Sequence, residues 1–336
     1  MLRVGFLKFI LVLNLFLAAT LFVNALETKE ITFSFAGDCT MGWDETLSYK
    51  YSFPDKLKEV NNDYSYFLSN VKLIFKQDDV TLLNLETTFT DAKKKASKQF
   101  RFKGEPSYVN ILKEGSVEMV NISNNHIYDY LTEGFDDTRK VLEENDILYS
   151  GEGHVAYYMK KDIKIASIGF RGFSTYIKDE VSKSIKKAKE NADIVVVSFH
   201  WGKEGSNYPN QTQTTLGRFA IDQGADIVIG HHPHVIQGIE KYKDKYIVYS
   251  LGNFCFGGNR NPKDKDCFIF QIKYSLMENE EVQGDGKIIP CKISSVNYIN
   301  DYRPTIVEKD EKERILNRIY IYSKKLEYGI QNKEKN

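Results

Sequence analysis

Five apolar segments, each followed within two residues by side chains of the kinds that bind metal ions, constrain this chain more than any other feature. Five of the six histidines lie in three of these segments. The segments are ITFSFAG before Asp38, VTLLNL before Glu86, EMVNIS before Asn125 and His126, DIVVVSF before His200, and DIVIG before His231, His232 and His234. Side chains just past the carboxyl ends of strands in an open α/β sheet converge on one crevice, so we expect these donors to share a site.

Strand-like and helix-like segments alternate through the first two thirds of the chain. The apolar patterns predict strands over 31–36, 80–85, 117–122, 163–169, 194–199 and 227–229, with a further short strand starting in 146–149. Helices are predicted over 64–77, 108–113, 134–144, 181–190 and 214–223. This alternation indicates an α/β fold with a mostly parallel central sheet.

From residue 239 onward the pattern changes to short strands around tight turns. Lys243 and Asp244 are expected at a hairpin turn, and 267–276 and 287–299 read as further strands. We expect these segments to form an antiparallel second sheet stacked on the first. The stretch 308–328 predicts an amphipathic surface helix. Because no long linker divides the chain, 26–336 is expected to form a single domain.

Residues 1–25 have the pattern of a secretory signal peptide. Arg3 and Lys8 flank the start of an apolar run that extends to Val23. This run falls short of the ~20 residues that span a bilayer comfortably. The alternative is an uncut N-terminal membrane anchor. In either case the positive end stays in the cytoplasm, so the rest of the chain is expected to be extracytoplasmic.

The charge balance and the cysteine spacing bear on nucleic-acid binding and on disulfide formation. The 336 residues hold 46 Lys and Arg against 46 Asp and Glu, a balance that argues against a nucleic-acid partner. The four cysteines form no CxxC pair. A disulfide between Cys267 and Cys291 is permitted outside the cytoplasm, but we expect none.

The GHHPH segment is the sharpest single motif. His232 and His234 flank Pro233, and such a turn can present both rings to one metal ion, unless they only bond backbone carbonyls. Glu204 follows His200 on a loop, where it can contact substrate, orient His200 or simply be solvated.

The segment NNHIYDYLTEG offers groups for acid–base chemistry. The amide oxygen of Asn125 can ligate a hard cation, His126 can donate a proton to a leaving oxygen, and Asp129 can orient the His126 ring. The alternative is a turn in which the asparagines bond their own backbone. Asn253, in the turn of YSLGNFCF, can either point into the crevice toward substrate or serve the architecture alone.

The run KKKASKQFRFK, residues 93–103, carries the strongest local charge bias. Its basic side chains can steer an anionic substrate toward the crevice, although a solvated loop is the simpler interpretation. His154 has no second donor nearby and is expected to lie outside the site.

Taken in order, these motifs resemble the CapA family of capsule and poly-γ-glutamate synthesis proteins, within the calcineurin-like metallophosphoesterase superfamily. The resemblance runs through GDCTMG, NLE, FKGEP, NNHIYDYLTEGFDDT, HWGKEG, GHHPHVIQGIE and IVYSLGNFCF. It implies a four-layer core of two β-sheets flanked by helices, and one or two divalent metal ions (Mn, Zn, Fe or Mg). The implied metal ligands are Asp38, Glu86, Asn125, His200, His232 and His234, with His126 protonating the leaving group.

Two departures from the superfamily pattern bear on activity. Asp38-Cys39-Thr40 stands where phosphoesterases have Asp-x-His, and Glu86 replaces a bridging aspartate. Losing one imidazole weakens the first metal position, so phosphoesterase activity does not follow from the fold.

The resemblance implies an extracytoplasmic accessory protein of capsule or poly-γ-glutamate assembly. Its expected partners are an anionic polymer and a membrane-embedded synthesis complex. The chain lacks a GxxxxGK[ST] loop, so it is not expected to be the ATP-dependent ligase. The alternatives are a secreted metal-dependent phosphoesterase acting on a cell-envelope substrate and a binding module with a vestigial metal centre.

Overall fold

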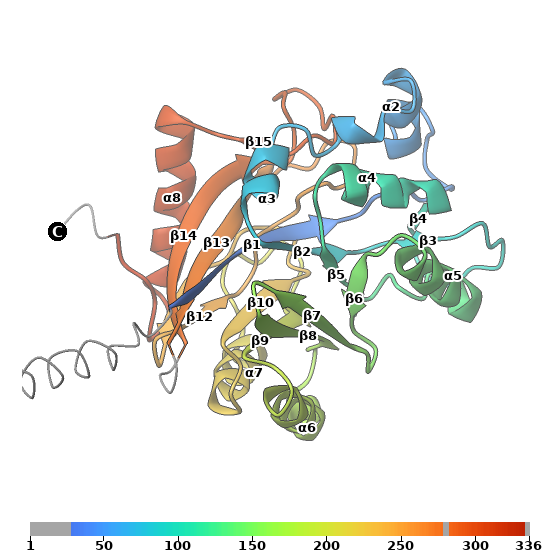
Figure 1. Ribbon diagram of the computed structural model, residues 1–336. Coiled ribbons are helices and arrows are strands. Elements are labelled where there is room, and N and C mark those ends of the chain that lie inside the picture. Colours follow the sequence, from blue (N-terminus) through green and yellow to red (C-terminus); the bar gives the residue numbers. More distant parts are fainter. Residues whose placement is uncertain (1–27, 278–281, 333–336) are drawn as a thin grey trace, which may run out of the picture.

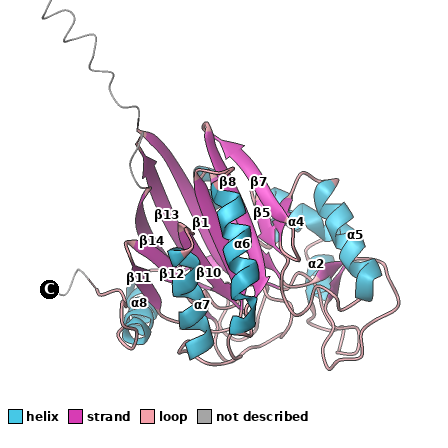
Figure 2. Ribbon diagram, turned by 90° about the horizontal axis from the view of Figure 1, so that it is seen from below, coloured by secondary structure: helices cyan, strands magenta, loops and turns pink. Residues whose placement is uncertain are grey.

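The computed structural model describes residues 28–277 and 282–332. The expected signal segment, residues 1–25, lies outside this range. Two β-sheets pack face to face between two layers of helices, as Figures 1 and 2 show. The predicted α/β class and the two-sheet, four-layer arrangement are confirmed.

The first sheet has seven strands in the order β15-β14-β13-β1-β2-β5-β6. Strands β1, β2, β5 and β6 run parallel, whereas β13, β14 and β15 add antiparallel to the free side of β1. The strands are β1 (Lys29–Cys39), β2 (Val80–Leu85), β5 (Met119–Asn121), β6 (Leu148–Ser150), β13 (Asp266–Leu276), β14 (Gln283–Lys292) and β15 (Thr305–Ile306).

The second sheet has six strands in the order β11-β12-β10-β9-β8-β7. Its four central strands are parallel, and β7 and β11 join the two edges antiparallel. The strands are β7 (Val155–Lys160), β8 (Ile163–Arg171), β9 (Ile194–His200), β10 (Ile227–His231), β11 (Ile239–Tyr242) and β12 (Lys245–Val248). A separate pair, β3 (Thr88–Phe89) and β4 (Lys103–Gly104), lies beyond β2.

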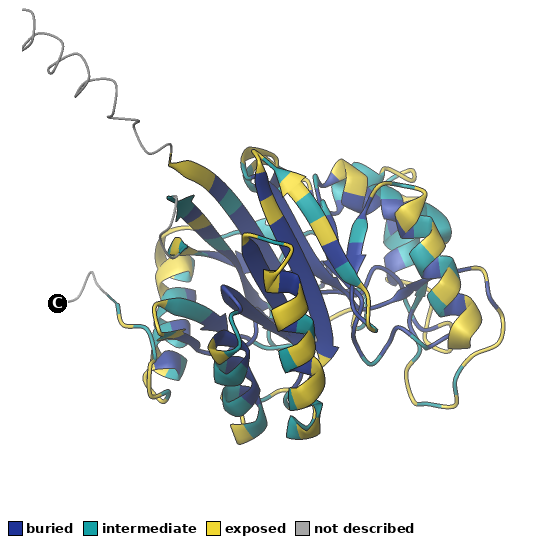
Figure 3. Cartoon of the chain, turned by 60° about the horizontal axis from the view of Figure 1, so that its bottom comes forward, coloured by how far each residue is buried: buried dark blue, intermediate teal, exposed yellow. Residues whose placement is uncertain are grey.

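Helices cover the outer face of each sheet. On the first sheet lie α2 (Phe53–Glu59), α3 (Lys72–Gln77), α4 (Val109–Glu114) and α5 (Leu131–Glu143). On the second lie α6 (Lys178–Lys189) and α7 (Gln211–Asp222), which bury one face each and expose the other (Figure 3). The last helix, α8 (Lys309–Ser323), lies against β11 and β14, at one end of both sheets.

Apolar side chains from both sheets fill the space between them. Phe33, Phe35 and Phe270 of the first sheet share one buried cluster with Val196 and Ile229 of the second. Such continuous burial on both faces accounts for the uninterrupted apolar runs that the sequence shows in β2, β9 and β10.

The prediction of a separate C-terminal sheet was wrong. Strands β13 and β14 extend the first sheet, because β13 pairs with β1 across more than 200 residues of sequence. Strands β11 and β12 instead join the second sheet. Their hairpin is confirmed: Lys243 and Asp244 have φ of 48° and 59°, the positive values that a tight hairpin turn of this type needs.

Smaller differences concern helix ends, and two cysteines lie side by side. The helix expected over 64–77 breaks into a short 3₁₀ turn, Tyr64–Tyr66, and α3, and the last helix ends at Ser323. Cys267 and Cys291 are opposite each other on β13 and β14, and both are free thiols. Among the described residues, no helix has the length and apolar character needed to cross a membrane.

Candidate metal centre

The donors that the sequence places after different strands lie together at one edge of the two sheets. Asp38 comes from β1, Glu86 follows β2, His200 ends β9, and His232 and His234 follow β10. Their ligand atoms form overlapping groups within 4.8 Å of one another: Asp38, Glu86 and His234; Glu86, His200 and His232; and Glu204, His232 and His234. Asn125 joins them through a 2.6 Å contact between its Oδ1 and His200 Nε2. The structure therefore brings together all six ligands that the resemblance implies.

Glu86 is the central group of this cluster. Its side chain is buried, and neither carboxylate oxygen has a hydrogen-bond partner among the described residues. Oε1 lies 3.5 Å from His200 Nε2, 3.7 Å from His234 Nε2 and 3.9 Å from His126 Nε2. Burial raises the pKa of Glu86 well above its ordinary value, despite the opposing attraction of His234. A buried carboxylate without donors is costly unless a cation neutralises it, so this donor set fits a metal ion.

The first of two adjoining ligand groups contains Asp38, Glu86 and His234. Asp38 Oδ1 accepts from Asn84 Nδ2 at 2.8 Å, and Oδ2 accepts from the His232 backbone N–H at 3.2 Å. Burial opposes ionisation of Asp38, but the hydrogen bond and charge of His234 hold its pKa below the ordinary value. Close packing fixes the strand here, since a Cβ on Gly37 would lie 1.9 Å from the carbonyl oxygen of Gly252.

His234 is oriented by Asn253. Its Nδ1 lies 2.9 Å from Asn253 Oδ1, and Asn253 Nδ2 donates to the His234 carbonyl at 3.1 Å. Nδ1–H donation would leave Nε2 free for a metal. Burial lowers the pKa of His234, but Glu86 and Asp38 outweigh it and raise the value to about 10, so without a metal a proton neutralises these carboxylates. Asn253 thus contacts a candidate metal donor, and its expected contact with substrate stays a prediction.

The second group contains Glu86, His200 and His232, with Asn125 beside them. Burial, followed by the neighbouring histidines, lowers the pKa of His200 well below its ordinary value. Burial likewise lowers the pKa of His232 to about 4. Both imidazoles are therefore neutral at physiological pH, which is the form that binds metals. Because Glu86 belongs to both groups, it would be a ligand common to both if each group held a cation.

The GHHPH turn has an unusual backbone. His232 and His234 have φ of 96° and 58°, values that are rare for residues other than glycine. The Pro233 carbonyl accepts from the Gly205 backbone N–H at 2.8 Å, which ties the Glu204 loop to the turn. Such strain is typical of residues whose positions serve a site.

Glu204 stands at the open side of the cluster. Its carboxylate is close to His232 and His234, and the residue is exposed. In the described part of the chain, no hydrogen bond joins Glu204 to His200, so Glu204 does not orient that ring. It remains available to a cation or to a bound ligand.

Thr40 occupies the position where phosphoesterases have an imidazole. It is buried, and within the part of the chain that the structure describes its Oγ1 has no hydrogen-bond partner. The first ligand group consequently has one imidazole, His234, and the second has two.

His126 and Asp129 form a pair beside the cluster. His126 Nδ1 lies 2.7 Å from Asp129 Oδ2, which also accepts from the Phe102 backbone N–H at 2.6 Å. The other ring nitrogen, Nε2, faces Glu86. Burial lowers the pKa of His126 despite the hydrogen bond to Asp129. The arrangement suits a proton transfer at Nε2 with Asp129 fixing the ring.

Lys98 belongs to the site, although the sequence shows it only as one member of a charged run. Its Nζ donates to Asp129 Oδ1 at 2.6 Å and to the Asn125 carbonyl at 2.7 Å. The basic loop therefore reaches into the site through this one lysine. Its position four residues after Lys94 gives no signal that separates it from its exposed neighbours.

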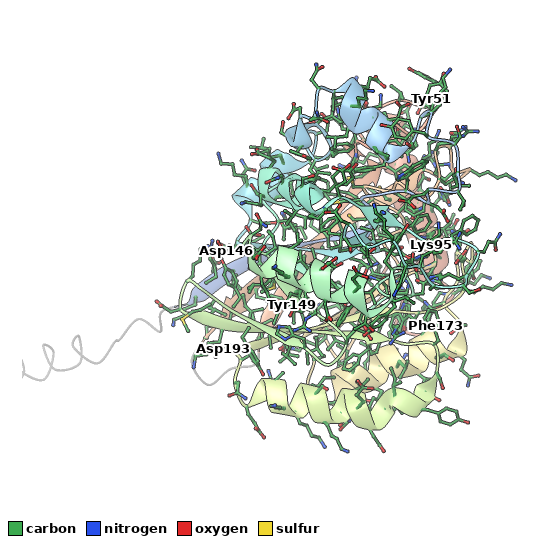
Figure 4. The ribbon with its side chains drawn as sticks, turned by 90° about the vertical axis from the view of Figure 1, so that its right-hand side faces the viewer. Tyr51, Lys95, Asp146, Tyr149, Phe173 and Asp193 are labelled. Carbon is green, nitrogen blue, oxygen red and sulfur yellow. The ribbon has the colours of Figure 1, made fainter. Side chains whose placement is uncertain are left out.

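Aromatic rings border the histidines. Phe102 packs on His126 at 4.6 Å, Phe173 on His232 at 4.9 Å and Phe256 on His234 at 5.3 Å between ring centroids. Figure 4 shows Phe173 and Lys95 on one side of the molecule, with Asp146 and Asp193, which precede strands, on the other. His154 stacks on Tyr149 and lies outside the cluster, as expected.

This donor set could hold a metal ion. A divalent cation held here supplies Lewis-acid polarisation of an acyl or phosphoryl oxygen. The chain places the His126 ring, the Lys98 ammonium group and three phenylalanine rings around this donor set.

Comparison with known proteins gives a consistent set of relatives. The family described as "Bacterial capsule synthesis protein PGA_cap" matches residues 32–258. "Capsule biosynthesis protein CapA" of Bacillus anthracis is 32% identical over 284 residues, covering 75% of this chain and 66% of that protein, just under two thirds of its length. "PGA biosynthesis protein CapA" of Bacillus subtilis (strain 168) is 31% identical over 312 residues, covering 86% and 77%.

More distant matches include a "Probable polyglutamine synthesis accessory protein" of Mycobacterium tuberculosis, 26% identical over 208 residues, covering 52% of this chain and 55% of that one. Among solved structures, the protein TT1561 of Thermus thermophilus matches with a TM-score of 0.43 and 10% identity, over 77% of this chain and 99% of that one. This structural likeness is weak, and the sequence relatives alone assign the family.

Proposed function

Since this chain belongs to the PGA_cap family of bacterial capsule synthesis proteins, we propose that it is an extracytoplasmic accessory protein of capsule assembly that acts on poly-γ-glutamate through a divalent-metal centre. Two relatives carry names that refer to capsule or PGA biosynthesis, and a third is named as a polyglutamine synthesis accessory protein. A membrane-embedded synthesis complex that exports the polymer is its proposed partner.

The observation that carries the metal centre is the environment of Glu86. Three histidine nitrogens surround its buried Oε1 at 3.5–3.9 Å, and no donor in residues 28–277 and 282–332 satisfies the carboxylate. One or two cations between these groups neutralise Glu86 and Asp38 together. Mn, Zn, Fe and Mg are all compatible with mixed oxygen and imidazole donors.

The charge around the site favours an anionic polymer. Lys98 stands within the centre, and the loop before it carries Lys93, Lys94 and Lys95, all exposed. A polyanion approaching along this loop meets positive charge before it reaches the metal donors. No part of the chain has the loop of an ATP-binding ligase, so the proposed role follows polymer synthesis.

A secreted phosphoesterase acting on a cell-envelope substrate is the second candidate. The free Nε2 of His126 beside Glu86 favours it, because a leaving alkoxide needs a proton at that place. Thr40 argues against it, since the first ligand group then has a single imidazole. Cleavage or transfer of a γ-amide bond uses the same proton donor for a leaving amine.

The test combines metal analysis with two substrates. Purified protein, its His234→Ala and His126→Ala variants and the surface control Lys140→Ala are analysed for bound Mn, Zn, Fe and Mg. Each is then incubated with poly-γ-glutamate and with bis(p-nitrophenyl) phosphate in the presence of Mn²⁺. The proposal expects near-stoichiometric metal that is lost only in His234→Ala, together with binding or shortening of the polymer.

The outcomes separate the two candidates. Phosphodiester turnover that vanishes in both histidine variants, with no effect on the polymer, would establish the phosphoesterase. A wild-type protein that binds no metal would overturn the metal centre altogether.

A further inference from the structure

A cavity of about 610 Å³ opens directly beside the candidate metal centre. Asn125 lines one side, and Phe173, whose ring packs on His232, lines another. The remaining walls come from the loop after β6, the end of β8 and the first turn of α6, so the cavity lies where the two sheets meet. A ligand in it therefore reaches the metal donors without crossing any intervening element.

Arg171, at the end of β8, lines one wall of the cavity and is held there by Glu152. Its Nη2 donates to Glu152 Oε2 at 2.8 Å, while Ser123 Oγ donates to Glu152 Oε1 at 3.0 Å. The Glu152 side chain is 10% exposed, whereas that of Arg171 is 45% exposed. The buried carboxylate thus fixes the guanidinium, whose other N–H donors are open to a second anion.

Glu180 supplies a negative charge to the same cavity. It lies in the first turn of α6, is exposed, and forms no hydrogen bond or ion pair among the described residues. Because Glu152 already balances Arg171, the cavity presents one open guanidinium edge and one surplus carboxylate. This combination suits a ligand end that carries an anion and a cation side by side, and it disfavours an interior stretch of a polyanion.

We infer that this cavity binds the amino-terminal residue of a γ-linked glutamate chain, with Arg171 taking its α-carboxylate and Glu180 its α-ammonium group. The inference rests on the proposed function and adds the part of the polymer that the site recognises. In a γ-linked chain only this terminal residue has a free ammonium group next to a free α-carboxylate. Every interior residue has an amide nitrogen there instead.

The chemistry of the terminal residue also fits the position of the metal donors. Its γ-carbonyl lies two methylene groups beyond the α-carbon, so a terminus seated on Arg171 and Glu180 can direct that carbonyl toward Asn125, which lines the same cavity. The rest of the chain then leaves along Lys98, which donates to the Asn125 backbone carbonyl. The exposed lysines of the basic loop continue this path.

The experiment measures affinity, so that it does not depend on turnover. Isothermal titration calorimetry follows binding of γ-linked triglutamate, and of the same peptide acetylated at its amino terminus, to the Mn²⁺-loaded full chain. The variants are Arg171→Gln and Glu180→Gln. The control is Arg139→Gln, an arginine that is ion-paired on the surface of α5 and lies outside the cavity.

We expect wild type and Arg139→Gln to bind the free peptide at least about tenfold more tightly than the acetylated one, since each lost charge-assisted contact costs roughly that factor. Arg171→Gln should weaken binding of both peptides about tenfold or more. Glu180→Gln should weaken only the free peptide and thereby abolish the difference between them.

Two results would overturn the inference in different ways. If wild type binds both peptides equally, the subsite is wrong while the proposed function stands, and this comparison needs no variant to fold. If wild type binds neither peptide and also ignores the long polymer, the polymer role itself fails, and the assigned occupant of the cavity fails with it.

Discussion

Glu86 Oε1 lies 3.5 Å from His200 Nε2, yet no hydrogen bond from the described residues reaches the Glu86 carboxylate. The two residues come from different sheets, since Glu86 follows β2 and His200 ends β9. An added cation could therefore balance the charge of the Glu86 carboxylate. Metal binding should then change the stability of the protein, which can be measured alongside its activity.

The effect of Glu86→Gln on the free energy of unfolding should have opposite signs in metal-free and in metal-loaded protein. In chelator the variant should be more stable than wild type by about 1–3 kcal/mol, because wild type has to keep a proton in this buried carboxyl cluster at a pH above the ordinary pKa of Glu86. With Mn²⁺ at a hundredfold excess over its Kd, wild type should gain about 2.7 kcal/mol and the variant little. Thermal unfolding with and without EDTA measures both, with Glu144→Gln at the exposed end of α5 as control. Equal metal-induced shifts in wild type and variant would remove Glu86 from the centre.

Asn253→Ala should weaken metal binding about 10- to 100-fold, the usual effect of removing a group that orients a ligating histidine. Asn253 holds His234 through both its side-chain oxygen and its side-chain nitrogen. Competition with a fluorescent chelator measures the affinity. Asn297→Ala, on an exposed loop, is the matched control and should leave it unchanged. Unaltered affinity in Asn253→Ala would mean that His234 keeps its position without this contact.

Lys98→Met should slow polymer processing at least about tenfold, because Lys98 fixes Asp129 and the backbone of Asn125. Lys94→Met, from the exposed part of the same loop, should lower only the apparent affinity for the polymer, and only at low ionic strength. Rates and apparent affinities at 20 mM and 300 mM salt, chosen as roughly low and high ionic strength, distinguish the two. Identical behaviour of the variants would reduce Lys98 to one more steering charge.

Asp78→Asn should stabilise the protein at pH 8 by about 1–3 kcal/mol and change little at pH 4, since each pKa unit corresponds to about 1.36 kcal/mol. Burial raises the pKa of Asp78 to about 7 from its ordinary value of 3.8, with hydrogen bonds opposing that shift and nearby Glu118 and Asp79 adding to it. The stabilising contribution of the protonated carboxyl is fully present below pH 3.8 and is lost as the pH rises through 7.

Thermal unfolding between pH 4 and pH 8 provides the check. The difference between Asp78→Asn and wild type should grow over the range from about pH 4 to about pH 7 and then stay constant. Asp310→Asn, in the exposed first turn of α8, is the control. A pH-independent difference would show that Asp78 ionises normally in the folded protein.

Part of the meeting of the metal donors could be predicted, because the carboxyl ends of parallel strands share an edge within one sheet whatever the strand order. Asp38 and Glu86 meet in this way in the first sheet, whereas His200 joins them only because the second sheet stacks with its own carboxyl edge beside theirs, which no local pattern shows. The order itself could not be predicted. The pairing of β13 with β1 is fixed by packing between segments far apart in the chain. The run of apolar residues in β13 would suit a strand of either sheet, so it does not predict which sheet β13 joins.

Orientation within the site was equally beyond the sequence. Asn253 lay in a recognisable turn, but its contact with His234 depends on how the β12 end meets the GHHPH turn. Lys98 could not be told from Lys94 and Lys95, because only the course of the loop decides which lysine points inward.

Asp38 lies in β1, and Glu86 and Asn125 follow other strands of the same sheet, whereas His200, His232 and His234 end or follow strands of the second sheet. A cation shared between these sets would act as a cross-link at one edge of two layers whose remaining interface is mainly apolar. Sliding of one layer past the other would then require breaking coordination bonds. Metal supply in the surrounding medium would set the mechanical rigidity of the whole domain, not only its chemistry.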